Sequence, residues 1–217
     1  MFEEVLASSF RGAIRALTGA RALWEGCEPS AQRRVYIGNH ASHGDFVLIW
    51  SALPAGIRDQ VRPVAGADYW NRDAIRRYLI RRVFNGVLIE RDPAKRTENA
   101  IQTLCNAVDA GASLILFPEG TRNVGDGVAP FKSGIFHLAE ERPDLEFVPV
   151  WLDNLKRVMP KGTLIPLPLL CTARFGAPLR LQAGEAKTAF LQRARAALLA
   201  LAEAGNVTKS VATTGAA

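Results

Sequence analysis

Residues 113–122 read Ser-Leu-Ile-Leu-Phe-Pro-Glu-Gly-Thr-Arg, and this stretch decides the fold class. After Ser113, its next four residues form an apolar run without polar alternation, which is typical of a strand buried on both faces. Pro118 cannot donate a ladder hydrogen bond, so the strand is expected to end there. Strands buried on both faces occur mainly in parallel sheets covered by helices, so the stretch predicts an α/β domain.

The remaining sequence alternates similar apolar runs with helical periodicity. The predicted strands are 35–38, 61–65, 87–90, 113–117, 147–151 and 170–175, and the predicted helices are 45–53, 70–83, 93–110, 131–141 and 185–204. This order predicts one layered α/β domain whose mostly parallel, mixed sheet is flanked by helices.

The two ends of the chain differ from this alternating region. Apolar residues at three- and four-residue spacings over 2–24, with arginines between them, predict an amphipathic helix that Gly26 ends. The Ala/Thr/Gly-rich C-terminus predicts disorder. We therefore expect an N-terminal amphipathic helix within residues 1–26, the domain over 27–204 and a disordered tail over 205–217.

Composition excludes several classes of protein. Three widely spaced cysteines among 217 residues exclude a disulfide scaffold and a cysteine-rich zinc module, and they suit a reducing compartment. The longest uncharged apolar run, 46–57, is far shorter than the ~20 residues that span a bilayer, and the acidic N-terminus does not resemble a secretory signal. The net charge of +6 favours an anionic partner, whether nucleic acid, lipid or a phosphorylated substrate.

The first predicted strand ends at a histidine and an aspartate, His40 and Asp45. If His40 lies in the turn and Asp45 in the first turn of the next helix, the carboxylate can reach the imidazole and fix its tautomer, leaving the other ring nitrogen as a general base. The same residues allow other interpretations: a metal site that includes His43, or a hydrolase triad with Ser42. The triad lacks a Gly-x-Ser-x-Gly elbow, and the metal site lacks a fourth ligand.

Arginines follow two other predicted strands, at Arg91 and Arg122. Guanidinium groups bind phosphate or carboxylate with two parallel hydrogen bonds, so two arginines at one edge of a sheet suit an anionic ligand. Solvated surface arginines remain the alternative.

Taken in order, these segments resemble the phospholipid/glycerol acyltransferase family. The first block of the family, H-x-x-x-x-D, corresponds to His40 and Asp45. The other blocks correspond to 86–91 (Gly-Val-Leu-Ile-Glu-Arg), 117–122 (Phe-Pro-Glu-Gly-Thr-Arg) and 148–150 (Val-Pro-Val), and the segments 131–134 and 174–178 are also similar. The resemblance covers about residues 33–180. At His43-Gly44 the sequence departs from the bulky pair that is common in the lysophosphatidate enzymes. The resemblance therefore does not determine the identity of the acceptor.

The resemblance implies direct transfer of a fatty acyl group from acyl-CoA or acyl carrier protein to a glycerol hydroxyl. His40 would be the base and Asp45 its partner, while the acceptor would be held by Arg91, Glu119, Gly120, Thr121 and Arg122. Neither a metal nor an organic cofactor is expected, because the thioester carries its own energy. The expected acceptor is 1-acylglycerol-3-phosphate, with lyso-ornithine lipid or another lysophospholipid as the alternative.

Such lipid substrates lie in a membrane, so the protein is expected to be cytoplasmic and to bind the inner face of the membrane peripherally. The N-terminal helix and the basic segment 70–84 combine arginines with aromatic residues, which suits an anionic lipid surface. Packing of these helices on the sheet is the alternative interpretation. A non-enzymatic protein that binds nucleic acid would leave His40 and Asp45 unexplained, and no zinc-finger or RNA-recognition signature supports it.

Overall fold

The computed structural model describes Ser9, Gly12 and residues 20–42, 44–91, 99–122, 127–153 and 171–214, with the backbone alone from residue 206 onward. These residues contain a seven-stranded sheet of order β1-β7-β6-β2-β5-β3-β4. All of its neighbouring strands are parallel except β6 and β7. The strands are β1 (Arg21–Trp24), β2 (Arg34–Gly38), β3 (Val61–Gly66), β4 (Val87–Ile89), β5 (Ser113–Leu116), β6 (Glu146–Leu152) and β7 (Thr172–Phe175). The predicted α/β class with a mostly parallel, mixed sheet is confirmed.

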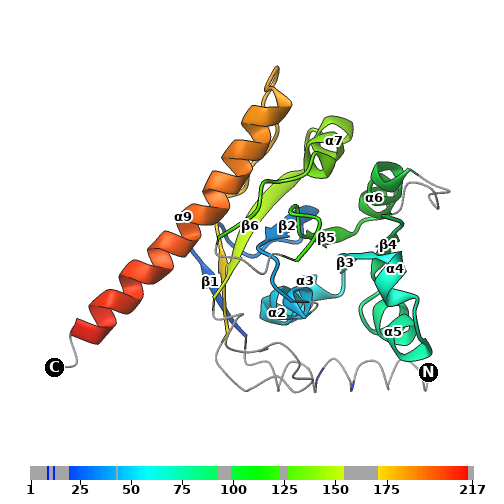
Figure 1. Ribbon diagram of the computed structural model, residues 1–217, viewed down its shortest axis with the longest axis horizontal. Coiled ribbons are helices and arrows are strands. Elements are labelled where there is room, and N and C mark those ends of the chain that lie inside the picture. Colours follow the sequence, from blue (N-terminus) through cyan, green and yellow to red (C-terminus); the bar gives the residue numbers. More distant parts are fainter. Residues whose placement is uncertain are drawn as a thin grey trace.

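Helices cover both faces of the sheet (Figure 1). On one face lie α2 (Asp45–Ala52) and α3 (Ala55–Arg58), followed along the chain by α4 (Ala67–Trp70), α5 (Ala74–Tyr78) and the π-helical turn η1 (Leu79–Val83). The other face carries α6 (Ala100–Asp109), α7 (Gly134–Glu141) and α9 (Lys187–Thr214). The result is a three-layer domain with the sheet in the middle.

The strands are apolar on both sides because each side faces a separate core. Tyr36 and Val148 point toward the core of the α2 layer, while Val35 and Phe147 point toward that of the α6, α7 and α9 layer. Neighbouring residues of one strand thus enter opposite cores, as the two-residue period of a strand requires. The unbroken apolar runs in the sequence have this physical cause.

The parallel strands β2, β3, β4 and β5 place their carboxyl ends at one edge of the sheet. The segments that leave these ends contain His40, Asp68, Arg91 and the loop 117–122. In open α/β sheets, ligands bind outside this edge. The fold therefore brings the predicted functional segments into one region.

The prediction of a helix over 2–24 is wrong at its C-terminal end. Residues Arg21–Trp24 form the edge strand β1, which pairs with β7. Trp24 stacks on Phe175 with ring centroids 4.0 Å apart, so a contact distant in sequence stabilises the extended backbone. The remainder of the predicted helix lies outside the described residues, apart from Ser9 and Gly12, which are helical.

Three further helix predictions differ from the structure. The segment 70–83 is not one helix but α5 and η1, preceded by α4, and Asp73 caps α5 by accepting a hydrogen bond from the Arg76 amide at 2.8 Å. Helix α7 begins at Gly134 instead of residue 131. Helix α9 continues to Thr214, where the sequence predicts a disordered tail from residue 205. Gly205 lets the helix pass close to Arg174, since a Cβ at this glycine would lie 2.9 Å from the guanidinium Nε.

Candidate active site

His40 and Asp45 meet in the turn between β2 and α2, as the sequence predicts. The His40 Nδ1 lies 2.9 Å from the Asp45 Oδ2. An ionised carboxylate only accepts hydrogen bonds, so this contact places the ring proton on Nδ1. The Nε2 has no hydrogen-bond partner among the described residues and carries the lone pair that can accept a proton.

The Asp45 carboxylate is fixed by more than the histidine. Its Oδ2 also accepts hydrogen bonds from the amides of Ala41 and Ser42, at 2.7 Å and 2.8 Å. The side chain is fully buried, and it lies in the first turn of α2, where the helix dipole favours a negative charge. The turn is therefore built around this carboxylate, which leaves the imidazole little rotational freedom.

Glu119 fixes the backbone of the same histidine. Its Oε1 accepts a hydrogen bond from the His40 amide at 2.9 Å, and its Oε2 accepts one from the Ala129 amide at 2.8 Å. The residue is 2% exposed. The resemblance predicts that Glu119 holds the acceptor, whereas both of its oxygens are bound to backbone amides here. These contacts favour a role in positioning His40.

Two more residues position the histidine, and the sequence does not indicate this role for either of them. The Asn39 side chain accepts a hydrogen bond from the Leu152 amide at 2.8 Å and donates one to the Leu152 carbonyl at 3.3 Å, which ties the end of β2 to β6. Phe117 stacks on the imidazole with centroids 4.3 Å apart. Phe117 directly precedes the Pro-Glu-Gly-Thr-Arg run, and this position is the feature of the sequence that indicates a role at the site.

A cleft of about 470 Å³ opens beside His40 at the carboxyl edge of the sheet. Its lining consists of apolar residues (the apolar wall) and of polar residues, four of which are cations (the cationic wall). The apolar residues include Val64, Ile89, Ile101, Leu104, Leu116, Phe117 and Ile135, the polar ones include His40, Asp68, Arg72, Arg91, Thr121, Arg122 and Lys132, and Gly120 also lines the cleft. The cleft thus brings together all the predicted site residues except the buried Asp45 and Glu119. A wall of this kind suits a ligand with an anionic head and a hydrocarbon tail.

The cations of the cleft differ in their partners. Arg91 donates from Nε and Nη2 to the two oxygens of Asp68, at 3.0 Å and 2.6 Å. This paired hydrogen bond lowers the pKa of Asp68 below its ordinary value. Gly66 makes room for the pair, because a Cβ there would lie 2.5 Å from the Arg91 Nε. Arg122 and Lys132 are exposed, and neither pairs with a carboxylate within the described part of the chain.

The described residues contain neither a cluster of three His, Cys, Asp or Glu side chains suited to a metal nor a helix long and apolar enough to cross a bilayer. His43, the third residue of the alternative metal site, lies outside the described residues.

Residues 24–153 match the family model described as Acyltransferase. The chain belongs to the acyltransferase family. The matched region contains the His40–Asp45 pair, Glu119 and the cationic wall of the cleft. The predicted family membership is therefore confirmed.

Members of this acyltransferase family resemble the chain in both sequence and fold. A 1-acyl-sn-glycerol-3-phosphate acyltransferase of Limnanthes alba is 32% identical over 161 residues, which cover 71% of this chain and 53% of that protein. A lyso-ornithine lipid O-acyltransferase of Brucella abortus is 30% identical over 140 residues, covering 64% of this chain and 46% of the relative. This chain spans about half the length of the curated relatives it matches.

The crystal structure of the 1-acyl-sn-glycerophosphate (LPA) acyltransferase PlsC from Thermotoga maritima shares the fold. Its TM-score is 0.68 at 18% identity, and the alignment covers 92% of this chain and 81% of that chain.

Proposed function

We propose that this acyltransferase moves a fatty acyl group from acyl-CoA or acyl carrier protein to the free hydroxyl of 1-acylglycerol-3-phosphate, in phospholipid synthesis. The observation that carries the proposal is the His40–Asp45 contact of 2.9 Å beside a cleft with an apolar wall and a cationic wall. Relatives named as 1-acyl-sn-glycerol-3-phosphate acyltransferases support the choice of acceptor.

The geometry suits direct transfer. The Nε2 of His40 takes the hydroxyl proton of the acceptor while the oxygen attacks the thioester carbonyl, and Asp45 stabilises the imidazolium. The tetrahedral intermediate then expels the thiolate, which takes the proton from His40 and leaves as free thiol. Every bond in this sequence is made or broken on the two substrates, so the step requires no cofactor, metal or acyl-enzyme.

Each remaining group has a proposed role at this centre. Glu119 and Asn39 hold the backbone around His40, so the base is in place before the substrates bind. Arg122 faces the anionic end of the acceptor, and Gly120 and Thr121 form the turn that presents it. Arg91, paired with Asp68, contributes a second guanidinium group to the lining of the cleft.

An acceptor panel tests this function. Wild-type protein is mixed with acyl-CoA and vesicles that contain lysophosphatidate, lyso-ornithine lipid or lysophosphatidylcholine, and both free thiol and acylated lipid are measured. We expect thiol and phosphatidate to appear in equal amounts with lysophosphatidate. Faster acylation of lyso-ornithine lipid would instead favour the second candidate, which rests on the Brucella abortus relative. No product with any acceptor would contradict the function.

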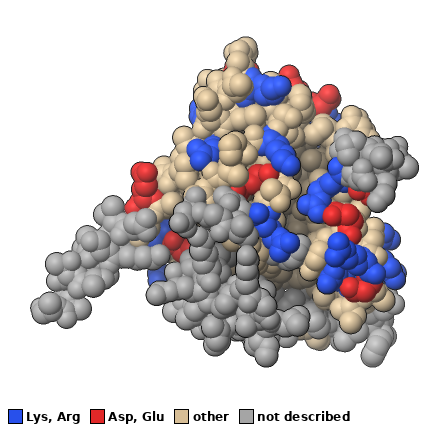
Figure 2. Space-filling view, viewed as in Figure 1, with Lys and Arg blue, Asp and Glu red and all other residues tan. Residues whose placement is uncertain are grey.

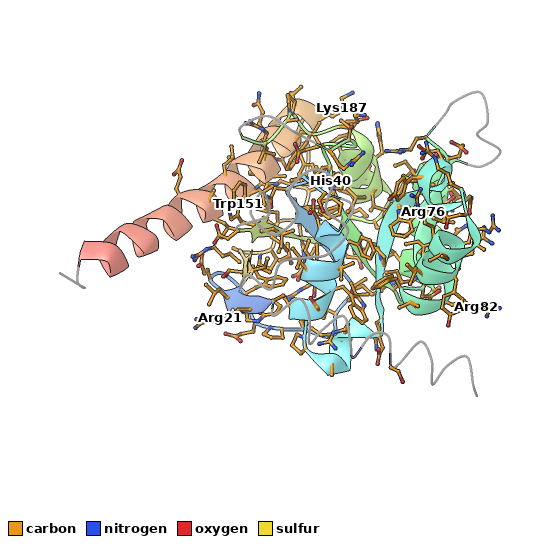
Figure 3. All side chains as sticks on the ribbon, turned by 60° about the horizontal axis from the view of Figure 1, so that its bottom comes forward. Arg21, His40, Arg76, Arg82, Trp151 and Lys187 are labelled. Carbon is orange, nitrogen blue, oxygen red and sulfur yellow. The ribbon has the colours of Figure 1, made fainter. Side chains whose placement is uncertain are left out.

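We also propose that the protein binds the anionic inner face of the membrane peripherally, through α5 and η1. Ile75 is 73% exposed, and it is the one exposed large hydrophobic side chain among the described residues. The same segment of the chain contains five arginines: Arg72, Arg76, Arg77, Arg81 and Arg82. Figure 2 shows Lys and Arg atoms gathered over the α4–α5 side of the molecule, and Figure 3 shows Arg76 and Arg82 there.

This basic surface adjoins the cleft. Arg76 lies 4.2 Å from the centre of the Tyr69 ring, and Tyr69 and Arg72 line the cleft. A lipid that leaves the membrane here would enter beside His40. Each arginine near an anionic surface contributes about 1 kcal/mol, an attraction that salt screens.

Vesicle co-sedimentation tests the membrane proposal. We expect Ile75→Glu to weaken binding to anionic vesicles several-fold, while Ile75→Leu binds like wild type and both variants keep their activity on a soluble short-chain acceptor. Equal sedimentation of Ile75→Glu and wild type would contradict this surface, and residues 1–24 would become the next to test.

A further inference from the structure

The cationic wall of the cleft contains a lysine to which neither the motifs nor the relatives assign a role. Lys132 lies 13 positions after Glu119 in sequence, but it lines the same cleft as His40 and Arg122. Its amide donates a hydrogen bond to the Pro118 carbonyl at 2.8 Å, which ties the segment before α7 to the loop after β5. The backbone of Lys132 is thus held directly against the loop that carries Glu119 and Arg122.

The side chain of Lys132 extends across Gly120. A Cβ at Gly120 would lie 2.7 Å, 2.8 Å and 2.9 Å from the Cδ, Cε and Nζ of Lys132. Gly120 also has φ of +70°, a left-handed conformation that favours glycine. The glycine therefore serves both the turn and the passage of the lysine, and the ammonium group lies over the residue between Glu119 and Thr121.

The partners of the other cations leave this lysine as an available positive charge. Arg91 is compensated by Asp68 through two hydrogen bonds, so an anion would have to compete with a carboxylate for it. Lys132 has no such competitor among the described residues, and its ammonium group supplies three donors. Glu119, the nearest acid in the loop, is occupied by the two backbone amides.

We propose that Lys132, together with Arg122, binds the phosphate of the acceptor, and that Lys132 thereby selects acceptors that carry a phosphate. This inference rests on the proposed function and names a residue that fixes its acceptor specificity. The phosphate would lie on the Gly120 side of the cleft, so the glycerol hydroxyl is presented to His40. The ligand chemistry is a phosphate group, which the acceptor and coenzyme A both contain, so the test must separate these two sources.

The test compares Lys132→Met with Lys132→Arg and with Lys187→Met. Lys187 is an exposed lysine at the start of α9 and does not line the cleft, so it controls for the loss of one positive charge (Figure 3). Steady-state kinetics are measured with lysophosphatidate and with 1-acylglycerol, which lacks the phosphate, and the donor is varied as acyl-CoA and as acyl-pantetheine. Binding of glycerol 3-phosphate without a donor is measured by NMR titration.

Loss of a charge-assisted hydrogen bond is expected to raise the KM for lysophosphatidate about 10- to 100-fold in Lys132→Met. The KM for the donors and the use of 1-acylglycerol should stay as in wild type, Lys132→Arg should recover most of the affinity, and Lys187→Met should match wild type. A raised KM for acyl-CoA but not for acyl-pantetheine would overturn the inference by assigning the phosphate to the donor.

The binding measurement separates this inference from the proposed function. If wild type acylates no lysophosphatidate, the proposed function fails, yet weaker binding of glycerol 3-phosphate by Lys132→Met would still support the phosphate site. Equal binding of glycerol 3-phosphate by wild type and Lys132→Met would overturn it. Because Lys132 is exposed, all variants should keep the wild-type melting temperature.

Discussion

The turn after β2 and the loop after β5 face the same cleft, but they use their charged groups differently. In the turn, Asp45 is fully buried, and its Oδ2 accepts hydrogen bonds from the His40 ring and from two backbone amides. In the loop and the segment after it, Arg122 and Lys132 are exposed and have no carboxylate partner among the described residues. The difference separates a preorganised proton acceptor from cations that remain available to a ligand.

This comparison predicts different kinetic consequences for the two regions. Changes in the turn should lower kcat, because they disturb the base in the transition state. Changes among the exposed cations should raise the KM for the acceptor, because they weaken binding.

The largest effect is expected for Asp45→Asn. The neutral amide cannot stabilise the imidazolium and does not hold the Nδ1 proton as the carboxylate does, so kcat should fall about 10²- to 10⁴-fold. The KM for the acceptor should change little. Kinetics under saturating substrates, with the melting temperature as a control for folding, measure this. A folded variant with kcat near that of wild type would remove Asp45 from the mechanism.

Glu119→Gln should also act on kcat, by a smaller factor, and should lower the free energy of unfolding. Glu119 accepts hydrogen bonds from two backbone N–H groups, and the side-chain NH2 group of glutamine would face one of them. That buried N–H would then have no acceptor, which lowers the free energy of unfolding by about 1–3 kcal/mol. Urea unfolding and steady-state kinetics measure the two effects. A raised KM for the acceptor with unchanged stability would return Glu119 to the substrate-binding role that the resemblance predicts.

Arg122→Ala and Arg91→Ala should differ, although both arginines follow strands that end at the cleft. Losing the available Arg122 should raise the acceptor KM by about 10-fold or more. Losing Arg91 should change it less than about 3-fold, because Asp68 already neutralises that guanidinium and exposed ion pairs contribute about 0–1 kcal/mol. Acceptor titrations of both variants decide the matter. A larger effect from Arg91→Ala would show that its pair with Asp68 opens to bind the substrate.

The smallest effect is expected for the triple variant Cys27→Ser, Cys105→Ser and Cys171→Ser. Its kcat should match that of wild type, apart from any cost of disturbed packing. Burial raises the pKa of all three thiols, which disfavours the nucleophilic thiolate. None of the three lines the cleft. Mass spectrometry of the protein during turnover provides the check, and an acylated cysteine would contradict direct transfer.

The sequence was sufficient wherever local patterns determine the structure. Apolar runs bounded by Pro118 or by glycine correctly predicted the central strands, and the spacing of His40 and Asp45 correctly predicted their contact across the turn. Both depend on residues within a few positions of one another. The candidate site could be assembled from the sequence because three strand ends converge at one edge of a parallel sheet.

The sequence was insufficient where distant partners determine the structure. The spacing of Trp24 from the preceding apolar residues predicts a helix, but Trp24 lies in strand β1, where it stacks on Phe175 of β7. Arg91 has the sequence context of an anion-binding residue, but Asp68, 23 positions away, already neutralises it. The resemblance predicts that Glu119 holds the acceptor, and no local pattern reveals that its partners are the amides of His40 and Ala129. No local pattern marks Lys132 as a binding residue either, because its side chain meets Gly120, 12 positions away in sequence.

The central claim is that His40 is the base for direct acyl transfer. The most direct test is the turnover number of His40→Ala with saturating acyl-CoA and lysophosphatidate, measured as free thiol and as phosphatidate, on protein whose melting temperature matches wild type. Loss of the general base should reduce turnover about 10²- to 10⁴-fold while binding of glycerol 3-phosphate persists. A folded His40→Ala protein that turns over at a rate near that of wild type would contradict the account.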